Sequence, residues 1–146
     1  MLIVDAPSHD EDNGSMMGFG STGGAIDTAL QEAGLSKADV YWTALIKKVK
    51  AGKQVSPEEI ETWRPYLQRE IDILKPPVIV LCGTAVIRAF MPDFKGKASD
   101  AAGKVVYSKE LDANIVIGFN PGEIYYDPDK QTLLNDVFIT VNELLA

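Results

Sequence analysis

The run from Val78 to Leu81 constrains this chain more than any other segment, because all four of its residues are apolar and most are β-branched. A continuous apolar run of this length is typical of a strand buried on both faces, as found where helices cover both sides of a parallel sheet. The run directly follows Lys75-Pro76-Pro77, which ends a helical pattern. The sequence therefore predicts the centre of an α/β sheet here.

A strongly marked helix precedes this strand. Ser56 supplies an N-cap, Pro57 occupies the first helical position and Glu59 completes a capping box. The apolar residues that follow at steps of three and four are Ile60, Trp63, Leu67, Ile71 and Leu74. This spacing places them on one helical face, which we expect to pack on the sheet.

The remaining pattern alternates strands with helices. We expect strands at 2–5, 40–46 and 115–119, a weak strand at 105–107 within the loop-rich segment 91–113, and helices at 25–33, 85–90 and near the end of the chain. Thr84 is expected to cap the short helix at 85–90. This order predicts a three-layer αβα sandwich with a mostly parallel central sheet, forming one domain over residues 1–146. Ligands of such sheets bind beyond the carboxyl ends of the strands, which here are the loops after Asp5, Ile46, Cys82 and Phe119.

Net charge, cysteine content and hydropathy exclude several classes of function. The net charge of -7 opposes non-specific attraction to phosphate, so contact with DNA requires a local basic patch. Cys82 is the only cysteine, which excludes a disulfide framework and predicts a buried core thiol, with reactive chemistry as the alternative. No apolar run approaches the roughly 20 residues that span a bilayer, and the start lacks a signal-peptide pattern. We expect a soluble, cytoplasmic protein with no membrane partner.

Several segments follow one another in a recognisable order and spacing. They are Val4-Asp5-Ala6-Pro7-Ser8, Gly20-Ser21-Thr22-Gly23, residues 41–47, 56–60, 64–67 and 77–85, Asn120-Pro121-Gly122 and residues 127–130. Together they resemble the iron–sulfur-type uracil-DNA glycosylases, whose domain also occurs joined to phage-type DNA polymerases. The resemblance covers most of the chain, with only 91–113 outside it.

The resemblance implies excision of a base that has been turned out of the DNA stack. Asp5 stands where the family has a glutamate, and its charge would stabilise the cationic sugar or orient the attacking water. It is one methylene shorter, and a side-chain hydrogen bond within its own loop is the alternative role. Asn120 replaces the family's histidine and could donate a hydrogen bond to the departing base. Asp5 and Asn120 are therefore the candidate catalytic residues.

The implied base pocket departs from the family. Ala44 stands where the family has the asparagine that distinguishes uracil from cytosine, and a methyl group makes no hydrogen bond. Phe19 provides a stacking surface if its loop is shifted by one residue, and packs within the loop otherwise. The other implied pocket residues are Ala6, Pro7, Ser8, Pro121 and Gly122. Two positions of the family's cluster cysteines carry Lys48 and Trp63, so we expect no iron–sulfur cluster and no other cofactor.

The dense basic run consists of Lys47, Lys48, Lys50 and Lys53. Contact with DNA phosphates and a solvated loop are both open interpretations. His9, the sole histidine, is either functional or a solvated loop residue.

The leading hypothesis is a domain associated with DNA repair or replication, with weak, altered or lost excision. The resemblance alone suggests the N-terminal module of a phage-type polymerase, with a replication protein or the fused polymerase as partner. The alternatives are an active glycosylase and a nucleotide- or phosphate-binding domain that uses the glycine-rich loop at residues 18–24.

Overall fold

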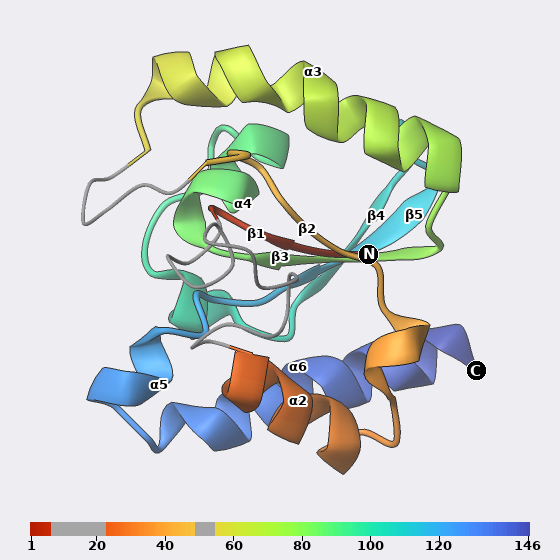
Figure 1. The fold of residues 1–146 in the computed structure, drawn as a ribbon, viewed down its shortest axis with the longest axis vertical. Coiled ribbons are helices and arrows are strands. Elements are labelled where there is room, and N and C mark those ends of the chain that lie inside the picture. Colours follow the sequence, from red (N-terminus) through yellow and green to blue (C-terminus); the bar gives the residue numbers. More distant parts are fainter. Residues whose placement is uncertain (7–22, 49–54) are drawn as a thin grey trace.

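The computed structural model describes residues 1–6, 23–48 and 55–146. The strands are β1 (Leu2–Val4), β2 (Trp42–Ala44), β3 (Val78–Cys82), β4 (Val105–Ser108) and β5 (Ala113–Ile117). The helices are α2 (Gly23–Glu32), α3 (Pro57–Leu74), α4 (Thr84–Phe90), α5 (Glu123–Tyr126) and α6 (Lys130–Leu145), with 3₁₀ turns at Lys37–Asp39 and Ala98–Ala101. Figure 1 shows three layers, in which α3 and α4 cover one face of the sheet and α2 and α6 cover the other. The predicted αβα architecture is confirmed.

The sheet has five strands in the order β2-β1-β3-β5-β4. β2, β1, β3 and β5 run parallel, and only β4 runs antiparallel to its neighbour. The run that the sequence places at the centre is β3, and every one of its residues is buried. Helices on both faces exclude water from it, which explains why it carries no polar side chain.

Helix α3 begins as its capping box predicts. Ser56 Oγ accepts a hydrogen bond of 3.2 Å from the Glu59 backbone N–H. Of the predicted apolar face, Leu67 and Ile71 are buried, whereas Leu74 is 46% exposed. The last turn of α3 therefore does not pack on the sheet. Trp63 is only partly buried against the core.

The Arg64 side chain joins α3 to α4. The Arg64 guanidinium lies 4.1 Å from the centroid of the Phe90 ring, and Arg64 Nε donates a hydrogen bond of 3.2 Å to the Ala89 carbonyl. A cation over an aromatic face is stabilised by the ring's charge distribution, more so when water is excluded. This contact holds the carboxyl end of α4 under α3.

Some element limits differ from the prediction. β2 covers only three of the seven residues predicted at 40–46, although Leu45 N–H still donates to the Val4 carbonyl at 2.9 Å. The strand thus continues beside β1 without regular pairing. Helix α5 and the two 3₁₀ turns were not predicted, because elements of three or four residues are too short to show a hydrophobic period. Among the described residues, no helix combines the length and apolar character needed to cross a membrane.

Candidate functional site at the carboxyl ends of the strands

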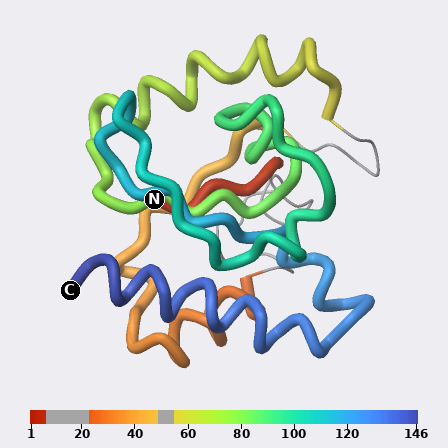
Figure 2. The backbone as a smooth tube through the Cα atoms, turned by 180° about the vertical axis from the view of Figure 1, so that it is seen from behind, coloured from red at the N-terminus to blue at the C-terminus, as the bar shows by residue number. Residues whose placement is uncertain are grey.

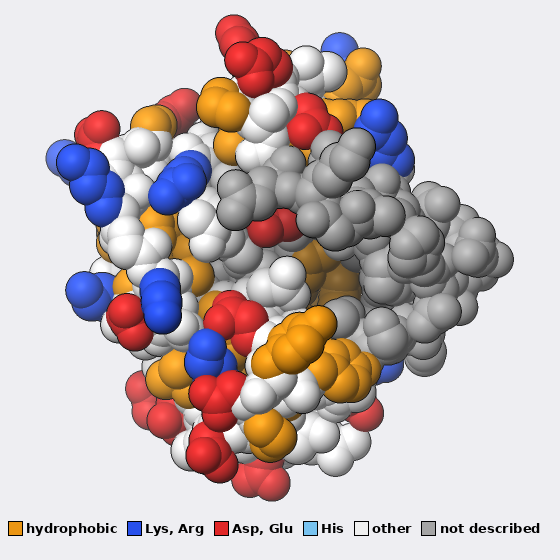
Figure 3. All heavy atoms as spheres, turned by 90° about the vertical axis from the view of Figure 1, so that its left-hand side faces the viewer, with side chains coloured by type: hydrophobic (Ala, Val, Ile, Leu, Met, Phe, Trp, Pro, Cys, Tyr) orange, Lys and Arg blue, Asp and Glu red, His pale blue; other side chains and the backbone are white. Residues whose placement is uncertain are grey.

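The parallel strands bring three predicted loops to one edge of the sheet. Val4 lies opposite Cys82, so Asp5 follows β1 at the level where Gly83 follows β3. Gly118 N–H donates to the Leu81 carbonyl at 2.8 Å, which aligns the end of β5 with the end of β3. Figure 3 views this edge face-on and shows a hollow near its centre. The predicted convergence of the loops after Asp5, Cys82 and Phe119 is confirmed, and β2, which leads to the fourth loop after Ile46, ends at the same edge because Ala44 pairs with Val4.

The Asp5 side chain is tied to α4. Its Oδ1 accepts a hydrogen bond of 2.9 Å from the Val86 backbone N–H. A Cβ atom on Gly83 would overlap the Asp5 carboxylate, so only glycine lets the acid approach the helix start this closely. Thr84 makes no cap hydrogen bond, which corrects the prediction that it caps this helix. Asp5, which follows β1, caps the helix instead.

Burial dominates the electrostatics of Asp5. It raises the pKa of the carboxyl above its ordinary value, and the hydrogen bonds from the Val86 and Ala85 N–H groups act in the opposite direction. The side chain therefore matches neither interpretation fully, since its hydrogen bond reaches another element rather than its own loop. What the geometry shows is a partly buried carboxylate that serves as the N-terminal cap of α4.

Cys82 lies directly beneath this site. Burial, with a smaller contribution from the Asp5 charge, raises the pKa of its thiol to about 12. The thiol is buried and stays protonated, as expected for a core cysteine. An iron–sulfur cluster is held by several thiolates, so one buried thiol does not fit such a group. No group of three potential metal ligands occurs within residues 1–6, 23–48 and 55–146.

Asn120 begins the loop after β5. Its Oδ1 accepts a hydrogen bond of 2.9 Å from Gly122 N–H, and its carbonyl accepts one of 3.0 Å from Glu123 N–H. Asn120 itself is exposed. The side-chain oxygen is thus used to turn the chain into α5, whereas the Nδ2 group makes no hydrogen bond to the described residues. A hydrogen-bond donor remains available at this edge.

β2 ends at Ala44, whose side chain is apolar. Ala44 is 4% exposed, and its carbonyl accepts a hydrogen bond from Lys47 Nζ. Ala44 pairs with Val4 of β1, so it lies in the row of strand ends that includes Asp5. A buried methyl group at this position supplies apolar contact only.

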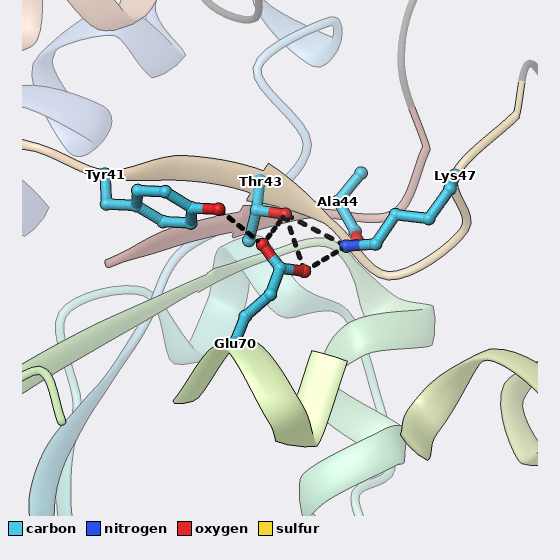
Figure 4. Close-up of polar contacts among 5 residues, drawn as sticks. All are labelled: Tyr41, Thr43, Ala44, Lys47 and Glu70. Atoms are coloured by element: carbon cyan, nitrogen blue, oxygen red, sulfur yellow. Dashed lines mark hydrogen bonds and ion pairs between the residues drawn. The ribbon is translucent and has the colours of Figure 1, made fainter. Parts of the chain in front are cut away.

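A polar cluster joins β2 to α3 beside Ala44 (Figure 4). Glu70 accepts hydrogen bonds from the Tyr41 hydroxyl at 2.7 Å and the Thr43 hydroxyl at 2.9 Å, and it pairs with Lys47. Burial alone would raise the pKa of Glu70, but the hydrogen bonds from Lys47, Tyr41 and Thr43 outweigh it and lower the pKa. The bond to Glu70 is also the main reason that the Tyr41 pKa is raised.

This cluster bears on the predicted basic run. The Lys47 ammonium points back onto Glu70 and Thr43, whereas Lys48 is exposed. Glu70 was not predicted as a site residue, because it lies on a polar position of α3 and its partners are more than 20 residues away in the chain. The remaining two lysines of the run, Lys50 and Lys53, lie outside the described residues.

The other predicted pocket residues are placed as follows. Ala6 and Gly122 are partly buried and Pro121 is buried at the same edge. Pro7, Ser8, Phe19 and His9 lie outside the described residues, as does most of the glycine-rich loop at 18–24. An apolar cavity of about 190 Å³ lies at the opposite, amino end of the sheet, lined by Met1, Leu35, Pro77 and Phe138 among others. That cavity is separate from the strand ends that carry Asp5 and Asn120.

Comparison with known proteins identifies the family of this chain. The sequence model of the uracil DNA glycosylase superfamily matches residues 1–145. The DNA polymerase III subunit alpha of Yersinia pestis is 31% identical over 113 residues, which are 77% of this chain and 10% of that protein. Type-4 uracil-DNA glycosylases of Sulfurisphaera tokodaii and Archaeoglobus fulgidus are 26% and 27% identical, each over 99% of this chain.

The matched lengths differ between these relatives. The chain spans about a tenth of the polymerase subunit but 69% and 75% of the two glycosylases. The match to both glycosylases includes the strand ends described above, because it covers nearly the whole chain. The αβα fold, the alignment of the strand ends and a sequence match from residue 1 to 145 show that this chain belongs to the uracil-DNA glycosylase superfamily.

Proposed function

We propose that this chain is a DNA-binding domain of the superfamily in which base excision is weak or lost. The observation that carries the proposal is the hydrogen bond between the Asp5 carboxylate and the start of α4. Excision needs a carboxylate whose charge is directed at the sugar as positive charge develops there. A carboxylate already held by backbone N–H groups of its own protein is a weaker stabiliser of that charge.

The end of β2 supports the same conclusion. Selection of uracil over cytosine requires a group that can both donate and accept hydrogen bonds. Ala44 offers a methyl group, and the polar side chains of Tyr41, Thr43 and Lys47 on the same segment are bound to Glu70. A site that lacks the matching polar partner discriminates poorly between bases. We therefore expect DNA binding with little preference for uracil.

Two exposed features at this edge suit contact with DNA. Lys48 follows β2 and can approach a phosphate, and Tyr126 on α5 is 93% exposed close after Asn120. In Figure 3, hydrophobic side chains gather below the hollow. Aromatic rings that face solvent can stack on unpaired bases whatever their sequence. These features favour single-stranded DNA over a specific duplex sequence.

The polymerase relative suggests a context. A part of the Yersinia pestis polymerase subunit is similar to 77% of this chain. We propose that this chain works beside, or joined to, a DNA polymerase or another replication protein, where a DNA-binding domain would hold the template strand. The N-terminal module of a phage-type polymerase is the specific arrangement that we favour.

An active glycosylase is the second candidate. It is favoured by the unbonded Nδ2 group of Asn120, which can donate to an anionic base oxygen, and by the acid retained at Asp5. Both groups follow strands that flank β3. In this case Asp5 would have to exchange its bond with Val86 for a contact with the sugar.

Fluorescence anisotropy with single-stranded oligonucleotides tests the proposal. Matched strands carry one uracil, thymine or cytosine at the same position. We expect salt-sensitive dissociation constants in the range of about 10⁻⁴ to 10⁻⁶ M that agree within about twofold among the three bases. Preference for uracil of tenfold or more, or no binding to any strand at low salt, would contradict the proposal.

A further inference from the structure

The segment from Arg88 to Lys104 differs in charge from the rest of the chain. It holds four basic residues, Arg88, Lys95, Lys97 and Lys104, and two acidic ones, Asp93 and Asp100, which gives +4 - 2 = +2. The whole chain has a net charge of -7. A local excess of positive charge in an acidic protein is the electrostatic pattern expected where a polyanion binds.

All four basic side chains are exposed. Within the described part of the chain, none of them forms an ion pair. Lys47 and Lys130, by contrast, are paired with Glu70 and Glu123. The four charges of this segment are therefore open to contact with phosphate groups, and such contact releases condensed counterions from DNA.

The fold brings this segment to the functional edge. Arg88 lies on α4, which follows the carboxyl end of β3. The Lys104 carbonyl accepts a hydrogen bond of 3.0 Å from Ile117 N–H, so Lys104 lies beside the carboxyl end of β5. Figure 2 shows the chain between them on the side of the sheet away from the viewer of Figure 1, and Figure 3 shows Lys and Arg side chains along the left flank of the hollow.

The strand order places two basic segments on opposite sides of the candidate site. Lys48 follows β2, one edge strand, and Lys104 precedes β4, the other edge strand. Asp5 and Asn120 follow strands between them. Five strands span four gaps of about 4.8 Å, or about 19 Å in total, a width that a strand of several nucleotides can cross.

We propose that Arg88, Lys95, Lys97 and Lys104 form a basic strip that binds the phosphates of single-stranded DNA as it crosses the carboxyl edge of the sheet. The inference rests on the proposed DNA-binding function and adds the path of the strand. The strand runs from the Lys48 side, past Asp5 and Asn120, to this strip. Phosphate contacts of this kind fix position without reading sequence.

The test compares two triple variants with equal net charge. The strip variant carries Lys95→Gln, Lys97→Gln and Lys104→Gln. The control variant carries Arg69→Gln, Lys75→Gln and Lys109→Gln, all exposed residues on α3 or next to the amino ends of β3 and β5. Each changes the net charge from -7 to -7 - 3 = -10. Thermal unfolding confirms that both variants are folded.

Binding of a single-stranded oligonucleotide is then measured between about 50 and about 200 mM salt. Loss of three phosphate contacts makes the negative slope of log affinity against log salt shallower by about 2, so this salt increase weakens the parent about 16-fold more than the strip variant. The control variant is expected to keep the parent slope.

Equal slopes in the parent, strip and control chains would overturn the strip while leaving DNA binding intact. Equal losses in both variants would assign the effect to net charge and also overturn it. Absence of binding by the parent at low salt would overturn both the strip and the proposed function.

Discussion

Asp5 Oδ1 accepts a 2.9 Å hydrogen bond from the backbone N–H of Val86, which lies 81 residues later in the chain. The bond joins the end of β1 to the first turn of α4, the helix that follows β3. It satisfies one of the N–H groups that a helix start leaves without an internal partner. The residue that the family resemblance suggests as catalytic is thus engaged in a contact between two elements of the fold.

Two substitutions of Asp5 distinguish the contribution of its cap hydrogen bond to stability from that of its charge. Asp5→Ala removes the acceptor and should lower the free energy of unfolding by about 1 kcal/mol, the usual cost of losing a helix cap. Asp5→Asn keeps an acceptor oxygen and avoids burying a charge, so it should be at least as stable as the parent at pH 7. Urea denaturation measures both. If the alanine variant were as stable as the asparagine variant, Asp5 would not be a cap.

Gly83 and Asp5 should be energetically coupled. Gly83→Ala places a methyl group where the Asp5 carboxylate lies and should cost about 1–3 kcal/mol, as overpacking commonly does. In the Asp5→Ala background the obstruction is smaller, so the same change should cost less. A double-mutant cycle gives the coupling energy. Additive effects would mean that the two residues do not meet.

Glu70 should contribute to the pH dependence of stability. Its folded-state pKa lies below the ordinary value of 4.5, so its contribution is complete above that pH and is lost as pH falls through the lower, folded-state pKa. Glu70→Gln should flatten the acid side of the stability curve measured by urea denaturation below about pH 4.5. The Asp5 carboxyl has the opposite sign, because burial raises its pKa and its contribution declines as pH rises above 3.8. An unchanged acid limb in Glu70→Gln would refute the role assigned to this cluster.

Lys47 and Lys48 should differ although they are adjacent. Lys47 is bound to Glu70, so Lys47→Ala should mainly reduce stability, by about 1 kcal/mol for loss of a partly buried charged hydrogen bond. Lys48 is exposed, so Lys48→Ala should weaken DNA binding and leave unfolding unchanged. Anisotropy and urea denaturation of both variants test this division. The reverse pattern would show that Lys47 leaves Glu70 to contact DNA.

Sequence patterns predicted the parts of the fold that depend on local rules. The cap at Ser56, the proline stop before β3 and the apolar run of β3 all follow from short-range physics, and each is found in the structure. The edge shared by the loops after β1, β3 and β5 followed from the parallel order alone. Family membership followed from residues at these loops.

Contacts between residues that are far apart in the chain could not be predicted from local sequence patterns. No residue near Asp5 in the sequence indicates that its carboxylate accepts a hydrogen bond from Val86. The sequence favours Thr84 as the cap because Thr84 stands directly at the start of the helix. The sequence pattern of α3 indicates that Glu70 is a solvated helix residue. Only the packing of α3 beside β2 brings it to Tyr41 and Thr43. The proposed basic strip was not predicted, because its residues are spread over 88–104 and belong to α4 and to the segment between α4 and β4.

Binding of DNA without efficient excision is the function proposed for this chain. The most direct measurement incubates the protein in excess over a labelled single-stranded oligonucleotide carrying one uracil, under conditions where anisotropy shows the strand bound, and counts alkali-labile breaks over time. We predict few or no breaks above the background of the protein-free strand. Rapid cleavage by the parent that disappears in Asp5→Ala, while that variant remains folded and still binds the strand, would contradict the account.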